Sequence, residues 1–87
     1  MNQKLYMQVI IQAIRDSASS DDKKVYKAFD WFGSVDFEEI CLQANLNPQH
    51  LRESLLKLIN SKDRKKISED IISAINGMAW QREVINH

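Results

Sequence analysis

The residues with the clearest chemical potential lie in the middle of the chain, where side chains that hydrogen-bond nucleic acids are grouped. Gln49, His50 and Arg52 can reach base edges in a major groove, and Lys57 can bind a phosphate. A basic run follows with four cations in five residues: Lys62, Arg64, Lys65 and Lys66. Together they predict a surface for double-stranded DNA. The alternative is an ordinary solvated helix face and loop.

The overall charge weakens the DNA interpretation. Twelve basic and twelve acidic side chains cancel in a chain of 87 residues. A free-standing nucleic-acid binder usually carries a basic excess, so DNA binding requires the positive charge to be clustered. A few phosphate contacts would give weak, salt-sensitive binding to a monomer, and tight binding would need an oligomer.

Catalytic and metal-binding chemistry is not expected. Cys41 falls at an inward helical position with no base near it in sequence, so we expect a buried core residue. His50 and His87 are the only histidines, which is too few for a recognisable metal site. No glycine-rich phosphate loop or paired nucleophile and base is visible. We therefore predict no enzyme activity, no cofactor, no metal and no small-molecule substrate.

The paired carboxylates have a structural explanation. Each pair falls where a helix is expected to begin, and negative charge is stabilised there by the helix dipole. These pairs are Asp21 and Asp22, Glu38 and Glu39, and Glu69 and Asp70.

The composition is that of a cytoplasmic, water-soluble domain. A single cysteine rules out an internal disulfide framework and fits a reducing compartment. The N-terminal apolar run is broken by Gln8 and Gln12 and lacks a small-residue cleavage site, so it predicts no signal peptide. No stretch approaches the roughly 20 apolar residues that a membrane span requires.

The candidate DNA-binding residues depend on a helix-turn-helix-like pair at about residues 36–60. For its first helix we expect Asp36 as N-cap, with Glu39 completing a capping box. Val35 and Ile40 would form the accompanying hydrophobic staple.

The second helix of the pair has stronger signals. Asn47 is a good N-cap, Pro48 suits the first helical position, and Leu46 can staple to Leu51. Asn45 stands where the twenty-residue template prefers glycine, and asparagine tolerates the left-handed backbone that the turn needs. Apolar or small residues match the template at five positions: Ile40, Cys41, Ala44, Leu46 and Leu51.

The apolar arc of this second helix is wide. Leu51, Leu55 and Leu58 form the core seam. Leu56 and Ile59 lie beyond it, so they contact either the first and fifth helices or a partner chain. The alternative to a DNA surface is therefore a protein interface at Leu56 and Ile59.

The remaining sequence predicts a compact all-α bundle of about five helices, because apolar residues recur at helical spacing and turn residues are few. We expect the first helix over residues 3–15, with its apolar face formed by Leu5, Val9, Ile10, Ala13 and Ile14. A linker over residues 16–22 would contain Ser20, the cap of a second helix that runs to Phe32. Gly33 would stop this helix in a left-handed conformation.

The fifth helix is expected to open at Ser68 and to end at Asn76, with Gly77 as its stop. Residues 1–77 would form one domain. Residues 78–87 would be a tail that either docks through Trp80 and Val84 or is loose.

One segment resembles a known group of sequences. The residues W-x-x-S-x-D-F-x-x-I-C-x-x-A-x-L-N-P-x-x-L-R, from Trp31 to Arg52, resemble small uncharacterised proteins encoded in phage and prophage regions. The resemblance covers about a quarter of the chain. It implies a phage-linked origin and a helix-turn-helix-like fold, and it implies no particular ligand.

Two functional hypotheses follow. The first is a phage-associated helix-turn-helix-like module that binds DNA weakly or as an oligomer, with a regulatory or packaging role. The second is a protein-interaction module, which binds a protein partner or itself, or a structural module; in either case it does not bind nucleic acid.

Overall fold

The computed structural model describes the chain over residues 3–85, with the side chains described over residues 3–77. Five helices follow one another: α1 (Gln3–Ser17), α2 (Asp22–Phe32), α3 (Val35–Gln43), α4 (Pro48–Ile59) and α5 (Arg64–Ile85). Over residues 3–85 there is no strand. The predicted all-α bundle is thus confirmed.

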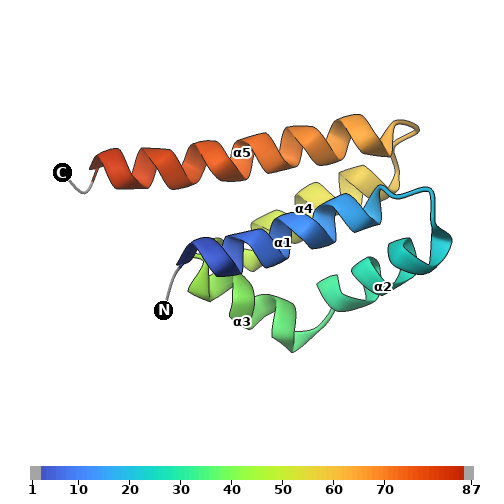
Figure 1. Cartoon of the computed structure of the whole chain (residues 1–87), viewed down its shortest axis with the longest axis horizontal. Coiled ribbons are helices and arrows are strands. Elements are labelled where there is room, and N and C mark those ends of the chain that lie inside the picture. The colour runs from blue at the N-terminus through green and yellow to red at the C-terminus, as the bar shows by residue number, and fades with distance from the viewer. Residues whose placement is uncertain (1–2, 86–87) are drawn as a thin grey trace.

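Helix α1 is the central element of the bundle. It packs against α2, α3 and α5, while α4 packs against α3 and α5. In Figure 1, α1 crosses the middle of the molecule, with α5 on one side and α2 and α3 on the other. Ile10 and Ile14 of α1 are fully buried. The core therefore forms around α1, with contributions from all five helices.

The apolar face of α1 differs from the prediction. Leu5 and Val9 are exposed, whereas Met7 and Ile11 are buried beside Ile10. Because three helices surround α1, its buried arc is set by where those neighbours lie. The helix also runs two residues longer than expected, to Ser17, whose hydroxyl donates to the Ile14 carbonyl at 2.6 Å.

The residues predicted to start and stop α2 differ from those observed or adopt another conformation. Asp21, rather than Ser20, is the N-cap, and its carboxylate accepts the Lys23 N–H at 3.0 Å. Gly33 has φ −85°, a right-handed conformation, so the predicted left-handed stop is wrong. The chain passes from α2 into α3 within two residues, and Ser34, in an extended conformation, makes that change of direction.

Helix α5 begins earlier and ends later than predicted. Asp63 performs the capping expected of Ser68: its carboxylate accepts the Lys66 N–H and its carbonyl accepts the Ile67 N–H, both at 3.2 Å. Ser68 is buried inside the helix and donates to the Lys65 carbonyl at 2.7 Å. Glu69 and Asp70 consequently lie beyond the first turn.

Gly77 lies within α5, so the predicted helix end there is wrong. Glycine lacks a favourable helix propensity but does not by itself end a helix. The helical backbone continues to Ile85, and the predicted docking through the Trp80 and Val84 side chains lies outside the side chains that the structure describes.

Candidate functional site

The start of α3 is fixed by Ser34. Its hydroxyl oxygen accepts the Phe37 N–H at 3.2 Å and donates to the Trp31 carbonyl at 2.6 Å. Asp36 lies one residue inside the helix, where its carboxylate accepts the indole N–H of Trp31 at 2.8 Å. The predicted capping box is therefore wrong, because Ser34 occupies the cap. The staple is wrong as well, since Val35 is 68% exposed.

The turn between α3 and α4 follows the prediction closely. Asn45 has φ 64°, the left-handed conformation that this position requires. The Asn45 N–H donates to the Leu42 carbonyl at 3.0 Å and the Leu46 N–H donates to the Cys41 carbonyl at 2.8 Å, which is a Schellman motif. The amide of Gln3 donates to the Ala44 carbonyl at 2.9 Å and ties the turn to α1.

The start of α4 is also confirmed. The Asn47 side chain accepts the N–H groups of Gln49 and His50 at 3.0 and 3.1 Å, and Pro48 occupies the first turn. Leu46 and Leu51 are both buried on either side of this cap. Gln49 and His50 are consequently held at the exposed N-terminal turn of α4.

Arg52 lies in a different environment from the one predicted. Its Nε donates to the Phe32 carbonyl at 2.8 Å and its Nη2 to the Ser34 carbonyl at 3.2 Å. Its Nη1 forms an ion pair with Glu38 at 3.1 Å. The guanidinium also lies over the Phe37 ring, 5.2 Å from the centroid. Three of its five N–H donors are thus occupied by the junction between α2 and α3.

The other predicted cations form no ion pair with a described side chain. Lys57 is exposed on α4, and the basic run begins in the loop and continues into the first turn of α5. The ion pair between Arg52 and Glu38 involves none of them. We call residues 57–66 the basic segment. All five of its cations are exposed: Lys57, Lys62, Arg64, Lys65 and Lys66.

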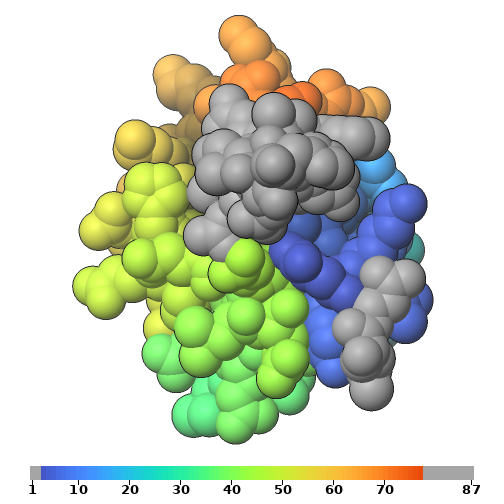
Figure 2. All heavy atoms as spheres, turned by 90° about the vertical axis from the view of Figure 1, so that its left-hand side faces the viewer, coloured from blue at the N-terminus to red at the C-terminus, as the bar shows by residue number. Residues whose placement is uncertain are grey.

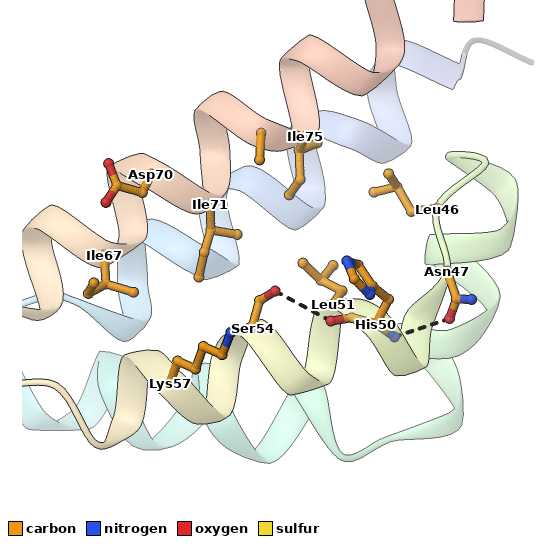
Figure 3. Close-up of a pocket in the computed structure, with 11 residues that line it drawn as sticks. Leu46, Asn47, His50, Leu51, Ser54, Lys57, Ile67, Asp70, Ile71 and Ile75 are labelled. Carbon is orange, nitrogen blue, oxygen red and sulfur yellow. Dashed lines mark hydrogen bonds between the residues drawn. The ribbon is translucent and has the colours of Figure 1, made fainter. Parts of the chain in front are cut away.

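A groove of about 290 Å³ lies between α4 and α5 (Figure 3). Its walls are apolar and include Leu51, Ile71 and Ile75, and its rim carries His50 and Lys57. Two of the residues predicted to contact DNA therefore face α5, on a different side of α4 from Arg52. Sequence spacing did not indicate this groove, because it depends on the angle at which α5 crosses α4.

The groove contains serine, histidine and aspartate side chains but no catalytic arrangement of them. The Ser54 hydroxyl donates to the backbone carbonyl of His50 at 3.4 Å, as Figure 3 shows. Among the described side chains no hydrogen bond joins the His50 imidazole to either Ser54 or Asp70. An activated serine would need both.

Cys41 is fully buried, as predicted, and burial raises the pKa of its thiol from 9.0 to about 11. A thiol with a raised pKa carries little thiolate at neutral pH, so it is a poor nucleophile. Across residues 3–77, no three histidine, cysteine, aspartate or glutamate side chains are placed to hold a metal ion.

Helices α3 and α4 share an exposed surface that is partly apolar. Val35 and Leu42 are seven residues apart on α3 and are 68% and 66% exposed. Leu56 on α4 is 58% exposed and follows Arg52 by one turn. We call this surface the α3–α4 face. It comprises Val35, Glu38, Glu39 and Leu42 of α3 with Arg52, Glu53 and Leu56 of α4.

Ile59 borders the α3–α4 face and is 38% exposed. The predicted interface residues are thus not part of the core: Leu56 is mostly exposed and Ile59 is partly exposed. Figure 2 shows α3, in green, at the surface of the end of the molecule where α3 leads into α4. Val35 and Leu42 were not predicted from the sequence to belong to an interface. Their seven-residue spacing was the available signal, but Val35 was assigned to a staple.

No helix of the described chain is long and apolar enough to cross a membrane. No protein-family model, curated protein or solved structure matches the chain. Function is therefore inferred from the residues themselves.

Proposed function

We propose that this chain is a small helix-turn-helix-like module that binds double-stranded DNA weakly, mainly through phosphates. The basic segment is the observation that carries the proposal. It holds five exposed cations and a single carboxylate, Asp63, within ten residues of a chain whose total charge is zero. The Asp63 carboxylate accepts the backbone N–H of Lys66 and so caps α5. This clustering meets the condition that the neutral composition imposes.

The arrangement of α3 and α4 supports the same proposal. A Schellman turn and an asparagine cap present Gln49 at the exposed N-terminal turn of α4, whereas His50 faces α5. In helix-turn-helix proteins, that turn of the second helix contacts base edges. Because Arg52 is held at the α2–α3 junction, little base readout remains. We therefore expect weak sequence discrimination and binding dominated by phosphates.

The biological setting of the proposal is a phage or prophage, in a regulatory or packaging role. It rests on the resemblance of residues 31–52 alone. A monomer with five available cations would bind weakly at physiological salt, so two or more copies would be needed for a tight complex.

The test is a titration of a mixed-sequence duplex of about 20 base pairs at about 50 and 200 mM salt. The double variant Lys65→Gln with Lys66→Gln should reduce the slope of log K against log salt by about 1.8, since each phosphate contact contributes about 0.9. The matched control, Lys24→Gln with Lys27→Gln on α2, removes the same charge and should leave the slope nearly unchanged. Absence of binding at 50 mM salt would reject the proposal.

A further inference from the structure

We infer that the α3–α4 face docks a basic, amphipathic helix of another protein. The inference does not depend on DNA binding, because the face and the basic segment share no residue. Val35, Glu38, Glu39 and Leu42 follow the spacing i, i+3, i+4 and i+7, so they form one side of α3. The ion pair between Glu38 and Arg52 joins this side to α4.

The exposed apolar residues of the face are not needed to hold the bundle together. In α3 the core contacts are made by Phe37 and Cys41, both fully buried. In α4 they are made by the seam that includes Leu55 and Leu58. Three large aliphatic side chains on two adjacent helices are therefore exposed to water, and one ion pair joins the two helices. Exposed aliphatic side chains of this size, with charged residues beside them, are typical of a protein-interaction site.

The charge of the face selects the partner. Three carboxylates belong to it, from Glu38, Glu39 and Glu53, against one guanidinium. That guanidinium is already bound to Glu38. A net charge of about −2 repels both DNA phosphates and the same face of a second copy. An amphipathic helix with leucine-like anchors and lysine or arginine beside them complements both the apolar cluster and its charge.

The direct test uses a synthetic helical probe of about 18 residues, five turns, with leucines on one face and lysines elsewhere. A second probe has the same leucines with glutamate in place of lysine. Fluorescence anisotropy with the full chain should show binding of the leucine–lysine probe only. Binding of both probes with equal affinity would overturn the inference, because charge would then play no part.

Variants locate the binding site. The double variant Leu42→Ser with Leu56→Ser should weaken binding of the leucine–lysine probe by at least about tenfold, as loss of central anchors does. The control, Leu5→Ser with Tyr26→Ser, removes comparably exposed apolar side chains from α1 and α2 and should change affinity by less than about twofold. Equal weakening by both double variants would overturn the inference.

Two further measurements distinguish a basic helix from a second copy of the chain as the partner of the α3–α4 face. Glu39→Gln should weaken binding of the leucine–lysine probe several-fold at low salt. Glu69→Gln on α5 should leave that affinity unchanged. Sedimentation of the chain alone should show a monomer over the tested concentrations. A dimer lost on Leu42→Ser with Leu56→Ser would overturn the inference in favour of self-association. Duplex binding by that variant should equal that of the native chain, so failure here is distinguishable from failure of the DNA proposal.

Discussion

Arg52 shows how a residue typical of DNA recognition can serve the fold instead. The carbonyl of Phe32 at the end of α2 has no partner within its own helix, and the carbonyl of Ser34 precedes α3. The planar guanidinium donates to both while pairing with Glu38. Lysine could not reproduce this geometry, because an ammonium is a compact charge without a rigid fork of donors. Arg52 therefore fixes the angle between α2, α3 and α4.

Other residues of the motif between Trp31 and Arg52 have similar structural roles. Trp31 donates to Asp36 at 2.8 Å, and Ser34 caps α3. The rings of Trp31 and Phe37 pack edge to face, 5.3 Å apart. Asn47 caps α4. Each of these side chains is explained by the junctions that it stabilises, so the motif describes a shape and leaves the ligand undetermined.

At the residue scale, the buried Cys41 predicts a pH-dependent stability. In the unfolded chain the thiol ionises near pH 9, whereas in the folded chain burial holds its pKa at about 11. Between these values unfolding releases a proton, so stability falls as pH rises from about 9 to about 11. The contribution is about 2 kcal/mol, measurable as the free energy of unfolding in urea across that range.

The control for Cys41 is Cys41→Ala, which removes the thiol and leaves every other titrating group. Its stability at pH 8 should be lower because of lost packing. Its decline between pH 9 and pH 11 should nevertheless be shallower than that of the native chain. Parallel curves for the two proteins would contradict the prediction.

At the scale of elements, the sequence predicted best where a signal had one local solution. Asn45 could satisfy the left-handed turn, and Asn47 followed by Pro48 could start a helix at only one place. The seam of α4 was predicted correctly because Leu51, Leu55 and Leu58 share one side of any helix there. These features need no knowledge of the other helices.

The prediction failed where two local solutions competed. Ser34 and Asp36 are both good caps, and Ser34 occupies the cap because α2 ends immediately before it. At α5, Asp63 and Ser68 competed in the same way, and the earlier cap adds a turn to the helix. For the candidate site, the basic segment was visible in the sequence. The α3–α4 face was only half visible, because the exposure of Val35 follows from the position of the cap.

The continuity of α5 gives a prediction at this scale. Gly77 lies inside the helix, and nothing lies within 4 Å of the position that a Cβ atom would occupy there. Gly77→Ala should therefore raise the free energy of unfolding by about 0.5–1 kcal/mol, since alanine favours the helix and restricts the unfolded chain. The free energy of unfolding is measured by urea denaturation, with circular dichroism as the readout. A loss of stability would mean that Gly77 ends the helix, as the sequence first indicated.

At the scale of the whole molecule, charge is separated although the total is zero. The basic segment carries a net charge of about +4, whereas α3 carries three carboxylates and no cation. The two proposed surfaces thus have opposite charge. A molecule of this kind could hold DNA at one surface and a basic helix at the other, and each complex would weaken as salt rises.

The central position of α1 predicts that the bundle unfolds as one unit. Ile10 is fully buried on α1, the helix that packs against α2, α3 and α5. Ile10→Ala should therefore lower the free energy of unfolding by about 2–5 kcal/mol. Val9→Ala, at the exposed neighbouring position, should cost less than about 1 kcal/mol. For both variants, made with Trp80→Phe so that fluorescence reports Trp31 alone, helix content and fluorescence should change at the same urea concentration, because Trp31 packs against the same core. If Ile10→Ala separated the two transitions, α1 would join elements that are stable independently, and the bundle would not be a single cooperative unit.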